Sequence, residues 1–168
     1  MSGFQHIFDL KGRTAIVTGG SGFLGSQFCR TLASAGANLI IADLDDSTAS
    51  HLAESIRNDG GNAEPLQVDV TQPDSVSTMV ERTLSLFGSL DILVNSAALD
   101  PKFDSRSLAG LQNNLSNNAT NGSFESFPLD AWNKAIEVNL TGAFLCCQAA
   151  GRVMLEENNG VIVNISSI

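Results

Sequence analysis

The segment from Thr14 to Asp43 constrains the fold of this chain most strongly. It begins with a short apolar run, 15–17, of the kind that a buried parallel strand requires. Four glycines crowd into the next turn, and apolar residues then recur at helical spacing until Gly36, which is typical of the residue that follows a helix. A second apolar run, 38–42, leads to Asp43. The pattern predicts a strand, a glycine-rich turn, a helix, a second strand and a terminal acid. The predicted buried face of that helix consists of Leu24, Phe28, Leu32 and Ala35.

This arrangement of elements favours the binding of a dinucleotide. Glycines let the backbone approach a pyrophosphate closely, and the free N–H groups at the start of a helix bind its negative charge. Asp43 stands 18 residues after Gly25 (43 − 25), near the usual gap of about 20. An acid at this position accepts hydrogen bonds from the adenosine ribose and repels a 2′-phosphate, so the segment predicts NAD rather than NADP. A glycine-rich turn without a ligand is the alternative.

The spacing of the glycines points to a family. The turn 18–25 reads T-G-x-x-G-x-x-G, which resembles the extended, sugar-nucleotide-modifying branch of the short-chain dehydrogenase/reductase superfamily. The main branch has T-G-x-x-x-G-x-G, with glycine in place of Phe23. Later motifs resemble the main branch more closely, so the chain combines the two patterns.

Strands and helices continue to alternate after Asp43. This rhythm predicts an α/β fold, a doubly wound parallel sheet of Rossmann type that is incomplete at its carboxyl-terminal side, with strand order 3-2-1-4-5. We interpret 1–168 as one partial NAD(P)-binding domain. The predicted features are a helix capped by Asp45 or Asp46, a strand at 63–68, a helix with Thr71 as its N-cap, a strand at 90–95, a helical region from Pro128 whose first apolar face holds Trp132, Ala135 and Ile136, and a strand at 161–165.

A polar stretch at about 98–127 interrupts this rhythm. It is too long for an ordinary connection, and such loops are usually functional or disordered. It leaves the carboxyl end of the fourth predicted strand, where ligands bind in such sheets. A substrate-covering loop and a tolerated surface insertion both fit the composition.

Two motifs at strand ends resemble cofactor-binding motifs of the same superfamily. Asp69-Val70 resembles its Asp-Val pair, whose carboxylate meets the adenine amino group; a helix-capping acid is the alternative. The sequence 95–98, N-S-A-A, resembles the N-N-A-G motif and departs from it at Ser96 and Ala98. The backbone at Ala97 would then line the ribose, whereas plain packing at a strand end is the alternative.

Two further motifs resemble parts of the catalytic machinery. Asn139, in V-N-L-T-G, resembles the helix-kinking Asn of the Asn-Ser-Tyr-Lys tetrad, whose backbone carbonyl holds a proton-relaying water. Its apolar neighbours Val138, Leu140 and Phe144 favour an interior position. Ser167 aligns with the catalytic serine, whose hydroxyl would bind the oxygen of the substrate. Without the family context, a serine pair in a strand-to-loop turn would be the simpler interpretation.

The resemblance implies a full set of site residues. The cofactor-binding residues would be Gly19, Ser21, Gly22, Phe23, Leu24, Gly25, Asp43, Leu44, Asp69, Val70, Asn95 and Ala97. The catalytic residues would be Ser167 and Asn139, with no metal. The acid–base of the family is the tyrosine of Y-x-x-x-K, and this chain contains no tyrosine. We therefore expect the chain to be the amino-terminal part of a longer enzyme, inactive by itself, with its last strand left as an unprotected sheet edge.

The resemblance implies an NAD-dependent oxidoreductase that passes hydride between NAD and a carbinol or ketone carbon. The substrate would be a small alcohol or ketone, a class that includes sugar derivatives. A sugar-nucleotide epimerase or dehydratase of the extended type is the second interpretation, and a catalytically inactive NAD-binding module is the third. The helix after Pro128 commonly forms a subunit interface in this family, so the resemblance also implies a homo-oligomer.

Composition narrows the partners and the compartment. The formal net charge is −9, and such an acidic surface disfavours nucleic acid and anionic membranes. The amino terminus has no signal-peptide pattern, and no run of about 18 apolar residues predicts a membrane span. The three cysteines lie in predicted helices without metal-ligand spacing, which favours buried thiols and a reducing cytoplasm.

Overall fold

The computed structural model describes residues 8–99, 125 and 127–166, and its centre is a five-stranded parallel sheet. The strands are β1 (Thr14–Thr18), β2 (Asn38–Asp43), β3 (Asn62–Gln67), β4 (Ile92–Asn95) and β5 (Val161–Asn164). Their order across the sheet is β3-β2-β1-β4-β5, which confirms the predicted topology. All strand ends that carry predicted site residues therefore meet at one edge, the carboxyl edge.

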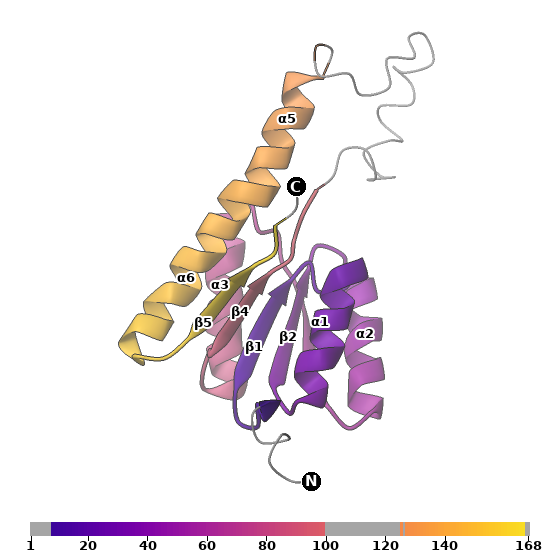
Figure 1. Ribbon diagram of the computed structural model, residues 1–168, viewed down its shortest axis with the longest axis vertical. Helices are drawn as coiled ribbons and strands as arrows, with labels where there is room; N and C mark the ends of the chain where they lie inside the picture. The colour runs from indigo at the N-terminus through magenta and orange to yellow at the C-terminus, as the bar shows by residue number, and fades with distance from the viewer. Residues whose placement is uncertain (1–7, 100–124, 126, 167–168) are drawn as a thin grey trace.

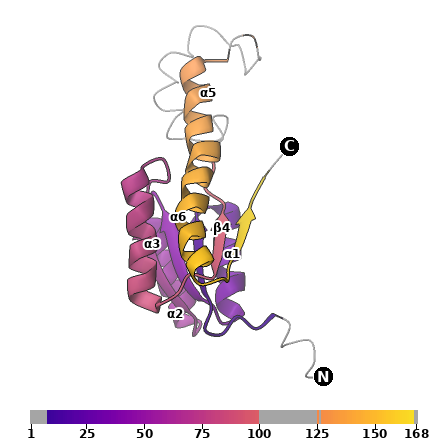
Figure 2. The same ribbon diagram turned by 90° about the vertical axis from the view of Figure 1, so that its left-hand side faces the viewer.

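Helices cover both faces of the sheet (Figures 1 and 2). One face carries α1 (Phe23–Ser34) and α2 (Asp46–Asn58). The other carries α3 (Pro73–Phe87) and α6 (Ala143–Glu156). Because side chains alternate along a strand, β1 supplies both cores: Val17 packs under α1 and α2, whereas Ile16 packs under α3 and α6.

The first helix presents a different face from the predicted one. Its buried residues are Gly25, Cys29 and Ala33, whereas Leu24 is half exposed. The reason is the glycine turn: a Cβ on Gly25 would collide with the carbonyl oxygen of Gly19, so the Gly25 side of the helix must lie against the turn. The predicted face is therefore wrong by one residue, although Phe28 and Leu32 still pack partly against the core.

The start of α3 also differs from the prediction. Pro73 occupies the first helical turn as expected, but the N-cap is Gln72 and not Thr71. The Thr71 hydroxyl instead donates to Asp69 Oδ1 at 2.7 Å. By contrast, α2 begins as predicted, because the Asp45 side chain accepts from two backbone N–H groups of its first turn.

The region after Pro128 forms one continuous helix with an irregular middle. It comprises α5 (Leu129–Ile136), the π-helical turn η3 (Glu137–Gly142) and α6. Figure 1 shows α5 extending past the carboxyl ends of the strands, and none of its residues is buried. The predicted apolar face there is thus uncovered: Trp132 and Ile136 are exposed.

The predicted interior position of Asn139 is wrong. Asn139 is exposed, and its apolar neighbours Leu140 and Phe144 are 63% and 59% exposed. The physical reason is that the helix projects past the sheet here, so that no described helix or strand covers Leu140 and Phe144. The 28-residue stretch 129–156 is long and apolar enough to cross a membrane by length and composition alone, contrary to the expectation from sequence. Its α6 portion nevertheless packs on the sheet through Cys146, Ala150 and Met154.

The sheet ends in β5, whose four residues are exposed and which pairs, among the described residues, with β4 alone. Residues 100–124 and 126 of the predicted loop and the predicted catalytic Ser167 lie outside the described residues.

Candidate functional site

The glycine turn between β1 and α1 is built by close backbone contacts. Gly19 has φ +61°, which glycine adopts without strain. A Cβ on Gly19 would lie 2.7 Å from Cα of Ala97, so the end of β4 lies directly against the turn. Together with the contact between Gly25 and Gly19, these approaches leave no room for side chains inside the turn. The inner side of the turn is therefore formed by backbone atoms.

The amino end of α1 has hydrogen-bond donors to offer. Its N-cap, Gly22, has no side chain to cap it, and no acidic residue lies in the first turn. The N–H groups of Phe23, Leu24 and Gly25 have no acceptor in the part of the chain that the structure describes. Such donors, together with the positive end of the helix dipole, can bind an anion such as a pyrophosphate. The side chains of Phe23 and Leu24 point to solvent, with 90% and 51% exposed.

Asp43 lies beside the glycine turn, at the carboxyl end of β2. Its Oδ2 accepts from the backbone N–H of Ser21 at 3.0 Å, and its Oδ1 accepts from the N–H of Asp45 at 3.1 Å. The Ser21 hydroxyl lies 2.9 Å from the hydroxyl of Thr48 on α2. The carboxylate is thus held between the glycine turn and α2, and the next residue, Leu44, is exposed.

Asp69 and Val70 follow β3 at the same edge. Asp69 Oδ1 accepts from both the N–H and the hydroxyl of Thr71, whereas no bond to its Oδ2 is formed among the described residues. The hydrogen bond from the Thr71 hydroxyl is the main reason why the pKa of Asp69 lies below its ordinary value. The carboxylate is therefore charged at neutral pH with one oxygen available. Val70 is buried at 8% exposure.

The residues at the end of β4 make two kinds of contact, one through the backbone and one through the Asn95 side chain. The Thr18 hydroxyl accepts from the N–H groups of Ser96 and Ala97, at 3.2 and 3.3 Å, and so holds that backbone beside the glycine turn. The side chain of Asn95 is buried beneath α6, and its Nδ2 donates to Asn164 Oδ1 at 2.8 Å. This placement favours strand-end packing for the Asn95 side chain.

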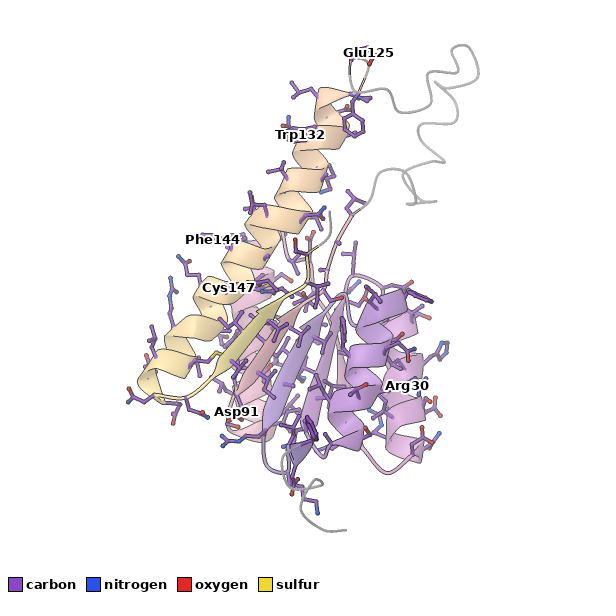
Figure 3. All side chains as sticks on the ribbon, viewed as in Figure 1. Arg30, Asp91, Glu125, Trp132, Phe144 and Cys147 are labelled. Atoms are coloured by element: carbon purple, nitrogen blue, oxygen red, sulfur yellow. The ribbon has the colours of Figure 1, made fainter. Side chains whose placement is uncertain are left out.

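The Asn95 amide has a further neighbour that the sequence did not indicate. Its Nδ2 lies 3.2 Å from Sγ of Cys147 on α6, a half-buried thiol (Figure 3). The Asn95 Oδ1 is buried and has no hydrogen-bond partner among the described residues. In those residues, no group of three or more His, Cys, Asp or Glu side chains lies close enough together to hold a metal ion.

Asn139 uses its side chain in a way that the motif did not predict. Its Nδ2 donates to the carbonyl of Leu99 at 3.0 Å, and its Oδ1 accepts from the N–H of Leu99 at 2.7 Å. The amide therefore fastens η3 to the segment that leaves β4. A π-helical turn spanning Asn139 also interrupts the regular helical bonding there.

The structure thus assembles most of the predicted site residues at the carboxyl edge of the sheet. Thr18, Thr71 and Leu99 are contributors that sequence reasoning missed. Thr18 could have been found, because it is the conspicuous first residue of the glycine motif. The partnership of Asn139 with Leu99 spans 40 residues and left no local signal.

Comparison with known proteins gives this geometry a family context. A family model described as short chain dehydrogenase matches residues 13–168. The cis-4-hydroxycyclohexanecarboxylate dehydrogenase of Sinomonas cyclohexanicum is 35% identical over 93% of this chain and 55% of its own length. The D-threitol dehydrogenase of Mycolicibacterium smegmatis is 32% identical over 95% of this chain and 54% of its own length. The chain spans about half the length of the curated relatives it matches.

Solved structures agree with these relatives. The crystal structure of gox2181 superposes with a TM-score of 0.83 at 34% identity, over 98% of this chain and 57% of that one. A 7α-hydroxysteroid dehydrogenase, complexed with NADH and 7-oxo glycochenodeoxycholic acid, superposes with a TM-score of 0.79 at 28% identity, over 99% of this chain and 57% of that one. The family model, the relatives and the shared fold together show that the chain belongs to the short-chain dehydrogenase family.

Proposed function

We propose that the intact protein is an NAD-dependent oxidoreductase that transfers hydride between NAD and a carbinol or ketone carbon. The observation that carries this proposal is the position of Asp43. Its carboxylate lies beside the donor-rich start of α1 and is held there by the N–H of Ser21 at 3.0 Å. An acid beside the N–H groups that would bind the pyrophosphate can accept hydrogen bonds from the adenosine ribose, and its negative charge repels a 2′-phosphate.

The other residues fit the remainder of a dinucleotide. The N–H groups of 23–25 would bind the pyrophosphate, with Gly19 and Gly22 giving it access, and Leu44 would flank the ribose. Asp69 Oδ2 would accept from the adenine amino group, and Val70 would form the adjoining wall. The lowered pKa of Asp69 keeps it an acceptor at neutral pH, with the Thr71 hydroxyl as the main cause. The Ala97 backbone would line the second ribose, and the Asn95 side chain would support that strand end.

The catalytic roles are assigned by the family resemblance. When bound, the nicotinamide ring would accept or supply the hydride. Ser167 would bind the oxygen of the substrate and orient it. Asn139 would hold the η3 turn to Leu99 while its backbone carbonyl serves the proton relay. These 168 residues include no tyrosine, so the activity is proposed for the whole protein.

A small secondary alcohol is the substrate class that we propose. The names of two relatives specify a hydroxycyclohexane carboxylate and the polyol threitol as substrates of those proteins. An epimerase or dehydratase is not favoured, because both of these relatives are dehydrogenases. An assay of full-length protein across cyclic alcohols and polyols, with NAD as oxidant, tests this class. NAD binding without turnover on any of them would favour the inactive module instead.

Titration calorimetry with NAD and NADP tests the cofactor directly. Wild type is expected to bind NAD more tightly than NADP. Asp43→Ala is expected to weaken NAD binding about 10- to 100-fold, since it removes charged hydrogen bonds of about 1.5–3 kcal/mol. The same substitution should reduce the preference for NAD over NADP. Asp46→Ala is the matched control, because Asp46 is an exposed acid three residues later and should leave both affinities unchanged. Equal affinities for wild type and Asp43→Ala would overturn the assignment.

The uncovered helix face supports a homo-oligomer. Trp132, Ile136, Leu140 and Phe144 are exposed at intervals of four, which places them along one side of the helix. We assign this side to a second copy of the chain and the protein to the cytoplasm, with no membrane or nucleic acid partner. Light scattering should show an oligomer for the full-length wild type and the loss of that oligomer in Phe144→Lys. Recovery of wild type in the membrane fraction would contradict this assignment.

A further inference from the structure

Gly142 ends the π-helical turn η3 in a place where no side chain fits. The residue is buried, and a Cβ added to it would lie 2.7 Å from Cγ2 of Val70, 3.1 Å from its Cβ and 3.3 Å from its carbonyl oxygen. The first of these distances is shorter than real Cβ contacts allow. The absence of a side chain at this position therefore determines how closely η3 approaches Val70.

Backbone conformation does not explain this glycine. Gly142 has φ −61° and ψ −46°, which are ordinary helical values open to any residue. Alanine would favour the helix more than glycine does. The close contact with Val70 is therefore the structural reason for a glycine at position 142. Gly151, in the same helix, provides the contrast, because a Cβ there would meet nothing within 4 Å.

The η3 turn is also held at its other side. Asn139, three residues before Gly142, binds both the N–H and the carbonyl of Leu99 through its amide. The turn is thus clamped between the segment after β4 and the segment after β3. Val70 cannot be pushed aside freely either, because it leads into Pro73 and α3, which packs beside α6.

From this geometry we infer that Gly142 is a positioning residue for the cofactor. By letting η3 lie against Val70, it sets the wall on which the adenine rests. A side chain at this position would displace Val70 toward the adenine space or lift η3 from Leu99. The inference rests on the proposed function, since it takes Val70 as part of the adenine site.

The test is a pair of glycine-to-alanine substitutions in one helix of the full-length protein. Gly142→Ala is expected to weaken binding of NAD about tenfold, as overpacking of a close contact does. AMP, which carries only the adenine half, should lose affinity by a similar factor. Gly151→Ala should change neither affinity. Thermal unfolding of each variant without cofactor shows whether the fold is retained.

A second substitution, at Val70, distinguishes a positioning role of Gly142 from a general loss of folding. Val70→Ala removes the methyl group at 2.7 Å, so in that background the effect of Gly142→Ala should fall to about threefold or less. If Gly142→Ala fails to fold, the double variant is expected to restore folding, and failure of both would overturn the inference. Equal NAD affinity of folded Gly142→Ala and wild type would also overturn it. Absence of NAD binding by wild type would instead overturn the proposed function, and the inference with it.

Discussion

Asp91 is the buried acid whose removal is expected to destabilise this fold. It is 8% exposed and lies just before β4, at the amino edge of the sheet, opposite the candidate site (Figure 3). Its Oδ1 accepts from Arg13 Nη1 at 2.7 Å and from Asn159 Nδ2 at 2.9 Å. Its Oδ2 accepts from the N–H of Thr14 at 2.9 Å and from the Ser89 hydroxyl at 3.0 Å. The carboxylate therefore joins the starts of β1, β4 and β5.

The size of the effect follows from which donors can turn to water. Thr14 is fully buried, so Asp91→Ala leaves its N–H without an acceptor at a cost of about 1–3 kcal/mol. The remaining donors include Arg13, whose side chain is 52% exposed, and they add about 0.5–1 kcal/mol in total for that reason. Asp91→Ala should thus lower the free energy of unfolding by about 3 kcal/mol, and Asp91→Asn, which keeps one acceptor for Thr14, by about 1–2 kcal/mol.

The effect should depend on pH in a defined direction. Burial alone would raise the pKa of Asp91, but the hydrogen bonds from Thr14, Arg13 and Ser89 outweigh it, and the pKa lies below its ordinary value of 3.8. A depressed pKa means that the stabilisation is complete above the ordinary value and is lost as pH falls through the lower, folded-state value. The difference between wild type and Asp91→Asn should therefore be constant near neutral pH and shrink in acid below about pH 4.

Urea unfolding of wild type, Asp91→Ala and Asp91→Asn at neutral pH and in acid measures these differences. Asp59→Ala is the control, because Asp59 is 77% exposed and lies 3.9 Å from Arg30, so its removal should change stability by less than about 0.5 kcal/mol. The predicted role of Asp91 would be wrong if Asp91→Ala were as stable as the control, or if the difference in stability between wild type and Asp91→Asn were the same in acid as at neutral pH.

The glycine turn, the acid on the adenine side and the thiols give three further predictions. Gly25→Ala should abolish measurable NAD binding in calorimetry, because its Cβ would collide with the carbonyl of Gly19; retained affinity would contradict this. Thr71→Val removes the hydroxyl that chiefly lowers the pKa of Asp69, so an NMR titration should show that pKa rising, and an unchanged value would exclude the hydroxyl as the cause. Ellman's reagent at pH 8 should label Cys147 first, because burial raises the pKa of the other two thiols to about 12; equal rates for all three would disprove it.

Local sequence preferences predicted the elements well. Apolar periodicity located the strands, and Gly36, which was predicted to follow the first helix, has positive φ. Such features depend on neighbours a few residues away, so they are readable in the chain itself. The errors in the α1 face and the α3 cap arose where a local preference competes with a distant contact. Gly25 faces the glycine turn and Thr71 binds Asp69, which the periodicity and capping rules do not consider.

For the candidate site, the sequence alone was enough to predict the strand–turn–helix unit and the acid at the end of β2. These follow from chain order, because a parallel sheet brings the carboxyl ends of its strands to one edge. The way those residues are held, by contrast, depends on contacts that form when the chain folds. The Asn139 amide reaches Leu99 across 40 residues, Asn95 turns beneath α6 to Asn164, and Gly142 meets Val70. Contacts between distant segments depend on how helices pack on the sheet, and that packing has no signature in any short stretch of sequence.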